Sequence, residues 1–305
     1  MRKIVLGTVQ MKCTDSEENI TKVLENEDLY KKLIIKNINR AEELVREAAK
    51  KGAKIILLPE LFELPYFCQE KNYEYYKLAT SVEENIAVNH FKKVAEELEV
   101  VLPISFFERD GNVTYNTVAI IDADGSVLGT YRKIHIPDDH FYQEKFYFTP
   151  GNLGFKVFET RYAKLGVGIC WDQWFPESAR SMANLGAEIL MYPTAIGTEP
   201  VLSCDSMPHW RRCMQGHAGS NLMPLVAANR VGTEKVVPND NNNMQESSLT
   251  FYGSSFIADE TGDIVEICDR NNEMTIIHEF DLDKISEFRS SWGVFRDRRP
   301  ECYIM

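Results

Sequence analysis

Apolar and polar positions along the chain form two alternating patterns. Short apolar runs bounded by glycine, proline or charged residues predict buried strands, and longer segments with apolar residues at helical spacing predict helices. In the first part of the chain these patterns give the order strand 4–9, helix 38–51, strand 54–58, helix 83–97 and strand 100–107. This repetition of strand, helix and strand predicts a layered α/β protein.

The same two patterns continue through the rest of the sequence. After a hairpin turn at Asp110-Gly111-Asn112 we expect strands 117–121, 128–132 and 164–169, helix 178–185, strand 188–193, helix 209–221, and strands 224–228, 254–258, 264–268 and 275–280. Segment 15–36 is polar and predicts a surface insertion or a lengthened helix, and segment 238–243 predicts a flexible surface loop. No shift in composition marks a domain boundary, so we expect one domain over 1–305.

Charge and residue counts exclude several classes of function. The formal net charge of -12 disfavours nucleic-acid binding and is compatible with a small cationic substrate. The cysteines contain no Cys-x-x-Cys pair and the histidines no His-x-x-x-His spacing, so neither a disulfide framework nor a metal site is indicated. No apolar window could span a bilayer, and Met1-Arg2-Lys3 leads directly into the first strand. We therefore expect a cytoplasmic protein with no membrane contact.

Three residues with chemical potential follow apolar strands. Glu60 closes the run at 54–58, Lys133 follows 128–132, and Cys170 follows 164–169. Strand ends of α/β sheets commonly present catalytic groups. A carboxylate, an ammonium group and a thiol form a sensible set for acyl transfer, because they supply a base, a cation for an oxyanion and a nucleophile.

Cys170 occupies the corner between a predicted strand and the helix that Pro176 and Glu177 open. A thiol at a strand end near a helix N-terminus lies close to a positive dipole end, which favours the thiolate. Each candidate also has a plain structural interpretation. Cys170 could be a buried structural cysteine, Glu60 a cap and Lys133 a solvated loop residue.

Three motif regions carry a family resemblance. Segments 57–62, 131–137 and 168–172 resemble, in the same order, the motifs of the nitrilase (carbon–nitrogen hydrolase) superfamily. The resemblance implies a four-layer αββα sandwich, homo-oligomers built from dimers, and no metal or organic cofactor. It also implies that Cys170 is the nucleophile, Glu60 the general base, Lys133 the cation that stabilises the oxyanion, and Glu144 a second glutamate that orients Lys133 or the substrate. The backbone N–H near Trp171 is a plausible second oxyanion donor.

Further stretches are most similar to the branch of the superfamily that hydrolyses N-carbamoylputrescine in polyamine synthesis. They are 144–148, 170–177, 192–200, 214–218 and 292–300. The expected products are putrescine, ammonia and carbon dioxide, formed through a carbamoyl-thioester on the cysteine. We expect Glu199 to bind the distal ammonium of this cationic ureido substrate, with Tyr66, Trp171 and Trp174 as aromatic neighbours capable of cation–π contact.

Several alternatives stay open from the sequence. Asp138 and Asp139 compete with Glu199 for the ammonium, or they cap the segment that follows. Trp171 and Asp172 equally suit buried packing and a local turn cap. On the same scaffold the protein could be an ω-amidase, a β-ureidopropionase, a D-carbamoylase or a true nitrilase. A non-catalytic binding or assembly module is disfavoured, because Glu60, Lys133 and Cys170 are all present.

Overall fold

The computed structural model describes residues 1–13, 26–198 and 203–303. Strand β8 (Ile189–Pro193) shows how the hydrophobic pattern builds its layers. All five residues of β8 are buried. Since successive side chains of a strand point to opposite faces, they enter two different cores. The first and third join a core between two sheets, whereas the second and fourth join a core beneath helices α4 (Pro176–Asn184) and α5 (Met207–Asn221).

The sheet that contains β8 has six strands in the order β13-β12-β9-β8-β7-β6. Its three central strands run parallel, β6 and β12 pair antiparallel to the two edges of this set, and β13 pairs antiparallel to β12. The other strands of this sheet are β6 (Val157–Glu159), β7 (Lys164–Val167), β9 (Leu225–Ala228), β12 (Phe256–Ala258) and β13 (Ile264–Ile267). Parallel central strands with buried faces read as continuous apolar runs, which is why the sequence predicts them.

The opposing sheet consists of two three-stranded parts, in the orders β14-β1-β2 and β3-β4-β5. A parallel bridge between Ile55 and Val101 joins the two parts. Its strands are β1 (Lys3–Gln10), β2 (Ile55–Leu57), β3 (Leu102–Asp110), β4 (Val113–Ile121), β5 (Val127–Arg132) and β14 (Met274–Asp281). A separate hairpin consists of β10 (Val231–Val236) and β11 (Ser247–Tyr252).

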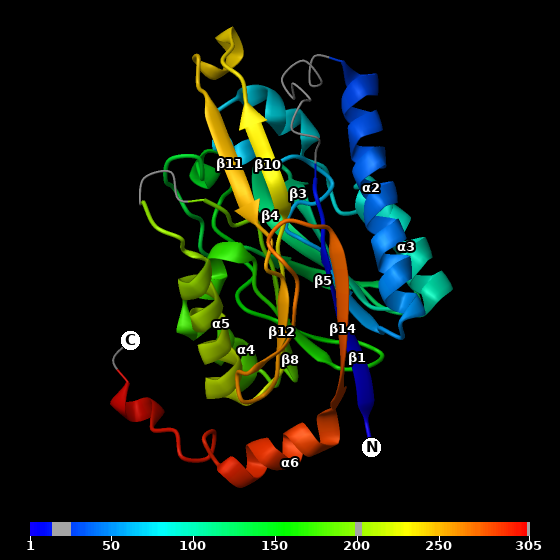
Figure 1. The fold of residues 1–305 in the computed structure, drawn as a ribbon, viewed down its shortest axis with the longest axis vertical. Coiled ribbons are helices and arrows are strands. Elements are labelled where there is room, and N and C mark those ends of the chain that lie inside the picture. Colours follow the sequence, from blue (N-terminus) through cyan, green and yellow to red (C-terminus); the bar gives the residue numbers. More distant parts are fainter. Residues whose placement is uncertain (14–25, 199–202, 304–305) are drawn as a thin grey trace.

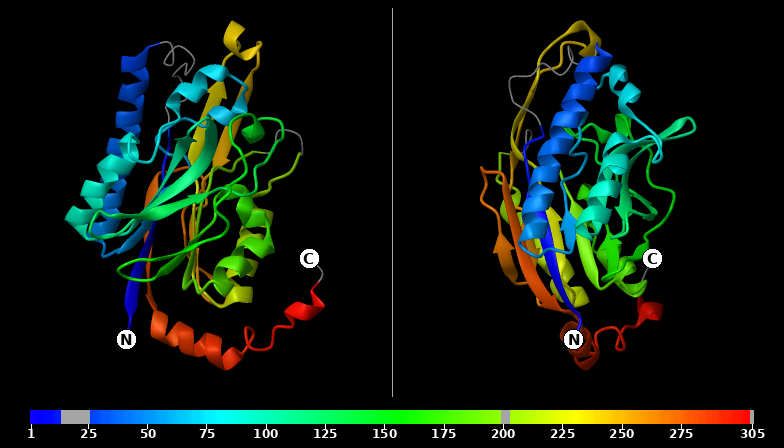
Figure 2. Two further views of the ribbon diagram at one scale, coloured as in Figure 1. Left: turned by 180° about the vertical axis from the view of Figure 1, so that it is seen from behind. Right: turned by 90° about the vertical axis from the view of Figure 1, so that its right-hand side faces the viewer.

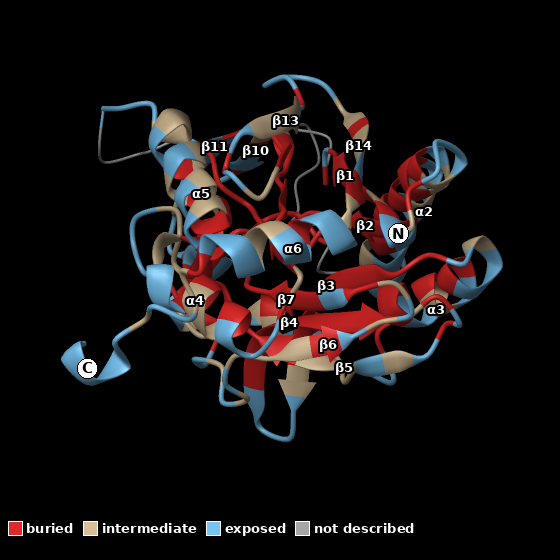
Figure 3. Cartoon of the chain, turned by 90° about the horizontal axis from the view of Figure 1, so that it is seen from below, coloured by how far each residue is buried: buried red, intermediate tan, exposed pale blue. Residues whose placement is uncertain are grey.

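Helices cover the outer face of each sheet. Helices α2 (Glu27–Lys50) and α3 (Ile86–Leu98) lie on one side of the strands, and α4 and α5 lie on the other (Figures 1 and 2). Seen from below, buried residues fill the centre between the sheets, while the helices turn their exposed sides outward (Figure 3). The predicted four-layer αββα sandwich is confirmed.

The structure decides one alternative that the sequence left open and contains elements that the sequence did not predict. The described part of segment 15–36 from residue 27 onward forms the first turns of α2, so this part is a lengthened helix. Residues 15–25 lie outside the described part of the chain. The sequence reading also missed the β10–β11 hairpin and helix α6 (Leu282–Trp292), which carries only two buried residues. Within the described ranges, no helix combines the length and the apolar character needed to cross a bilayer.

The position of β8 between two cores predicts a large cost for truncating one of its side chains. Leu190→Ala is expected to lower the free energy of unfolding by about 2–5 kcal/mol, because it removes a fully buried side chain and leaves a cavity. Leu128→Ala, at a position that is 39% exposed, is the matched control and should cost no more than about 0.5 kcal/mol. Urea unfolding of both variants measures the difference, and equal costs would contradict this description of β8.

Candidate active site

Lys133 lies at the centre of the site, directly after β5. Its ammonium Nζ is 2.8 Å from Glu60 Oε1 and 2.6 Å from Glu144 Oε2, and the three side chains have no exposed surface. Burial alone lowers the pKa of an amine. Here the carboxylates of Glu144 and Glu60 outweigh that effect and hold the pKa of Lys133 well above its ordinary value. The lysine is therefore a permanent cation inside the protein.

Glu60 approaches Lys133 from the segment that follows β2. Its Oε1 accepts hydrogen bonds from Lys133 and, at 2.6 Å, from Asn116 Nδ2. Its Oε2 is buried and has no hydrogen-bond partner among the described residues. Since buried polar atoms are usually paired, this carboxylate oxygen is available to a proton from a nucleophile or a substrate.

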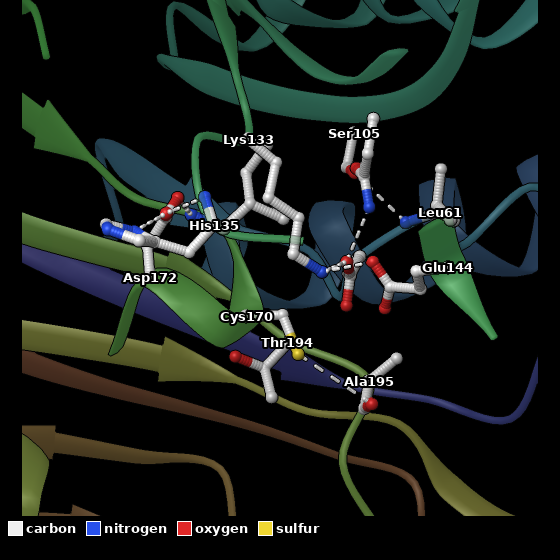
Figure 4. A network of polar contacts seen from close by, with 12 residues as sticks. Leu61, Ser105, Lys133, His135, Glu144, Cys170, Asp172, Thr194 and Ala195 are labelled. Atoms are coloured by element: carbon white, nitrogen blue, oxygen red, sulfur yellow. Dashed lines mark hydrogen bonds and ion pairs between the residues drawn. The ribbon is translucent and has the colours of Figure 1, made fainter. Parts of the chain in front are cut away.

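Cys170 sits on a turn with φ of +42°, in the left-handed region that residues other than glycine rarely adopt. The thiol is buried, with its Sγ 3.9 Å from the carbonyl oxygen of Ala195. Figure 4 shows Cys170 and Ala195 side by side below the Lys133 side chain, which points toward Glu144. Cys170, Lys133 and Glu144 therefore belong to one cluster.

The surroundings of Cys170 favour the thiol over the thiolate that its position near a helix N-terminus would favour. Burial and the negative charge of Glu60 raise the pKa of the Cys170 thiol well above its ordinary value, and the Lys133 cation opposes them only in part. The α-helix starts at Pro176, as predicted, but a 3-10 segment, Cys170–Trp174, separates Cys170 from its N-terminus. Cys170 thus needs a base to remove its proton.

Asp172 fixes the turn that carries Cys170. Its Oδ2 accepts hydrogen bonds from the Tyr131 hydroxyl at 2.7 Å and from the Ile169 N–H at 2.9 Å. Its Oδ1 accepts the His135 N–H at 3.0 Å and lies 2.7 Å from His135 Nδ1. Figure 4 shows Asp172 and His135 meeting on one side of Lys133. The local turn cap considered for Asp172 is therefore present, and it also ties the Cys170 turn to the end of β5.

Glu144 opens a short 3-10 helix, Glu144–Phe146. Burial and the charge of Glu60 raise its pKa, while the Lys133 ammonium opposes this rise. The Tyr66 hydroxyl donates a hydrogen bond of 2.7 Å to Glu144 Oε1. Tyr66 is buried and packs edge-on against the rings of Tyr142 and Phe251. Its hydroxyl is thus committed to holding the second glutamate.

The other predicted binding residues are placed less centrally. Trp171 is 38% exposed and packs edge to face with Trp174, whose ring centroid is 6.1 Å away. Asp138 and Asp139 are exposed, and Asp139 Oδ1 accepts the N–H of the adjacent residue, His140. Glu199 lies outside the described residues.

Two polar residues that the sequence reading missed follow β9 directly. The Asn229 side chain bonds both the N–H and the carbonyl of Ile196. Arg230 is fully buried and donates to the backbone carbonyls of Glu60 and Leu61. Their position directly after the apolar run 224–228 could have identified them, because the other candidates were identified by the same kind of position.

The donor set suits acyl transfer. Among residues 1–13, 26–198 and 203–303, no group of three or more histidine, cysteine or acidic side chains is arranged to hold a metal ion. The cluster supplies a thiol, a carboxylate with a free oxygen and a fixed cation. Together these groups can deprotonate a nucleophile, attack a carbonyl-like carbon and stabilise the resulting oxyanion.

Comparison with known proteins agrees with this fold. Residues 29–290 match the carbon–nitrogen hydrolase family. A crystal structure of a carbon–nitrogen hydrolase from Helicobacter pylori G27 has a TM-score of 0.85 and 36% identity, covering 99% of this chain and 97% of that one. This chain belongs to the carbon–nitrogen hydrolase family, and it is an enzyme of that class.

Sequence relatives are similar over nearly the whole chain. An N-carbamoylputrescine amidase from Oryza sativa is 53% identical over 302 residues, which cover 99% of this chain and 93% of the rice protein. The protein of the same name from Arabidopsis thaliana is 52% identical, with 99% and 94% coverage. A citrullinase from Francisella tularensis is 54% identical over 268 residues, covering 88% of this chain and 91% of that protein.

The Asp172 cluster predicts a specific role for one hydroxyl. Tyr131→Phe is expected to lower the free energy of unfolding by about 1–2 kcal/mol, because it removes one hydrogen bond to a buried carboxylate without creating a large cavity. Tyr73→Phe, at a position that is 77% exposed, is the control and should change stability by less than about 0.5 kcal/mol. Urea unfolding tests both variants, and an unchanged midpoint for Tyr131→Phe would contradict the role given to this contact.

The two carboxylates around Lys133 predict a pH-dependent defect when the cation is removed. In Lys133→Met, Glu60 and Glu144 lie buried without a counter-charge, so we expect a loss of about 3–5 kcal/mol at neutral pH. Burial already raises the pKa of Glu144, so without Lys133 its folded-state pKa lies above its unfolded value, and the folded state binds more protons than the unfolded state between the two. Stability of this variant should therefore fall as the pH rises above about 4.5.

Urea unfolding at about pH 5 and about pH 8 tests this sign, because the interval lies above the ordinary glutamate pKa of about 4.3, where only a raised folded-state pKa makes stability depend on pH. Lys145→Met removes an exposed lysine next to Glu144 and is the matched control. An equal loss of stability at both pH values in Lys133→Met would contradict the electrostatic explanation.

Proposed function

We propose that this enzyme hydrolyses N-carbamoylputrescine to putrescine, ammonia and carbon dioxide, with Cys170 as the nucleophile. The observation that carries the chemistry is the buried Lys133 ammonium, held between Glu60 and Glu144 and close enough for all three charges to act on the Cys170 thiol. The N-carbamoylputrescine amidases of rice and Arabidopsis, similar over nearly their full lengths, support the choice of substrate.

The first half of the reaction forms a carbon–sulfur bond. The Cys170 sulfur attacks the ureido carbon while its proton passes to the free Oε2 of Glu60. Negative charge moves to the ureido oxygen, where the Lys133 ammonium and the backbone N–H of Trp171 stabilise it. When this intermediate collapses, the carbon–nitrogen bond to putrescine breaks, and Glu60 returns the proton to the leaving amine. A carbamoyl group stays on the sulfur.

The second half releases the carbamoyl group. Glu60 takes a proton from water as the water oxygen adds to the thioester carbon, and Lys133 again faces the developing oxyanion. Collapse breaks the carbon–sulfur bond, returns the proton to Cys170 and frees carbamic acid, which decomposes to ammonia and carbon dioxide. Glu144 and Tyr66 hold the Lys133 ammonium in place through both halves.

Recognition of the substrate needs groups for its distal ammonium. The roles predicted from the sequence for Glu199, with Tyr66, Trp171 and Trp174 as aromatic neighbours, are kept as part of the proposal. An aromatic face within reach of an ammonium contributes about 0.5–2 kcal/mol. The single domain over 1–305, assembly from dimers and a cytoplasmic location also stay predictions.

Citrulline is a second candidate substrate. It carries the same ureido group on an alkyl chain and adds a carboxylate beside its ammonium group. The 54% identity to the Francisella tularensis citrullinase specifically favours it. The two substrates therefore test whether the pocket tolerates a carboxylate, while the chemistry at Cys170 is the same for both.

Ammonia release from N-carbamoylputrescine, citrulline and N-carbamoyl-β-alanine, measured in parallel, tests this function. We expect kcat/KM for N-carbamoylputrescine to exceed that for citrulline by at least about tenfold, which corresponds to about 1.4 kcal/mol. Cys170→Ala should abolish release and Cys302→Ala, at an exposed position, should retain it. Faster release from citrulline would make it the substrate, and release from N-carbamoyl-β-alanine alone would overturn the cationic pocket.

A further inference from the structure

Arg230 is one of the largest fully buried side chains in the described part of the protein. Its guanidinium group donates to the Glu60 carbonyl through Nε at 3.2 Å and Nη2 at 2.9 Å, and to the Leu61 carbonyl through Nη2 at 2.7 Å. The remaining nitrogen, Nη1, donates to Glu234 Oε1 at 2.9 Å. All three nitrogens of this buried cation are thus in use.

The backbone that Arg230 holds is strained. Leu61 has φ of +49°, a left-handed conformation that costs about 1–3 kcal/mol in a residue other than glycine. The Leu61 N–H donates to Ser105 Oγ at 3.0 Å, so this residue is held on both of its backbone polar groups. Such a conformation persists only where the surroundings determine it, and here it directs the Glu60 side chain toward Lys133.

Glu234 connects Arg230, through Tyr66, to Glu144. Its Oε1 accepts from Arg230, and its Oε2 accepts the backbone N–H of Tyr66 at 2.6 Å. The hydroxyl of that tyrosine donates to Glu144. The ion pair between Arg230 and Glu234, whose side chains are 0% and 3% exposed, therefore has one connection to each carboxylate that flanks Lys133.

We infer that Arg230 and Glu234 are a positioning pair that sets where Glu60 and Glu144 lie around the Lys133 ammonium. Neither residue belongs to the groups that touch the reacting atoms in the proposed mechanism. Arg230 acts through the backbone of the Glu60–Leu61 turn, and Glu234 acts through Tyr66. This inference rests on the proposed thiol chemistry and adds two residues to the machinery that supports it.

A lysine at position 230 would keep the charge but not the contacts. The guanidinium group is a planar fork with several fixed donors, and it reaches two carbonyls and a carboxylate at once. A lysine ammonium is a compact point charge and cannot span the same three acceptors in this geometry. Arg230→Lys therefore tests positioning while the buried positive charge is retained.

The experiment compares wild type with Arg230→Lys, Glu234→Gln and a matched control, Arg289→Lys. Arg289 also donates from its guanidinium group to a backbone carbonyl, that of Leu222, but it lies outside the site. We expect kcat of Arg230→Lys to fall about tenfold to hundredfold, as for a displacement of a catalytic group by about 1 Å, while KM changes by less than about threefold. Arg289→Lys should stay within about twofold of wild type in both constants.

A second readout needs no substrate. Labelling by iodoacetamide, followed at single cysteines by peptide mass spectrometry, reports how readily Glu60 takes the Cys170 proton. In Arg230→Lys we expect Cys170 to label more slowly, by a factor like that in kcat, while the exposed Cys204 and Cys302 label at the wild-type rate. Since this readout is independent of turnover, inactivity of wild type toward all three substrates would refute the proposed function without deciding the role of Arg230.

Two results would overturn the inference. The first is a folded Arg230→Lys variant whose Cys170 is labelled at the wild-type rate. The second is an equal slowing of Cys170 labelling in Arg230→Lys and in the control, Arg289→Lys. If Arg230→Lys shows no cooperative melting, Glu234→Gln decides by the same criteria, because its amide cannot accept from both Arg230 and the Tyr66 N–H. Unchanged labelling of Cys170 in a folded Glu234→Gln would then reject the positioning pair.

Discussion

A lysine ammonium without exposed surface, held between two equally buried carboxylates, is the constraint on which this structure depends. Removing these charges from water costs several kcal/mol for each ion, and only close opposite charges and further hydrogen bonds recover that cost. Lys133, Glu60 and Glu144 come from three separate parts of the chain, so the sandwich must close correctly for any of them to be buried. Folding and the assembly of the site are the same event here.

The layers explain why these groups meet. Strands β2, β5 and β7 end close together across the two facing sheets, and each is followed by a residue of the site. Turns with left-handed backbone at Leu61 and Cys170 then redirect the chain. Buried hydrogen bonds hold both turns: the side chain of Asp172 secures one and that of Arg230 the other. In a low-dielectric interior such contacts are strong, and an unpaired member is costly.

How much the sequence predicts depends on burial. Elements packed on both faces, such as β8, are visible as apolar runs, whereas β10 and β11 contain exposed or partly exposed positions and α6 has two buried residues, and these three were missed. Glu60, Lys133 and Cys170 were found because each follows a strand within a recognisable motif. The role of Arg230 could not be found in this way, since the two residues whose carbonyls it holds are 169 and 170 positions away. The direction of the pKa shift of Cys170 could not be found from the sequence either, because it depends on how deeply the fold buries the thiol.

The contact between Arg230 and the Glu60 turn also bears on how the protein is made. During synthesis, Glu60, Lys133 and Cys170 leave the ribosome well before Arg230, which holds the Glu60 turn. Strand β14, which pairs along the whole length of β1, is translated later still. A nascent or prematurely ended chain therefore carries the thiol without the geometry that lets a base take its proton. Translation therefore completes the geometry of the site only after Arg230 has been made.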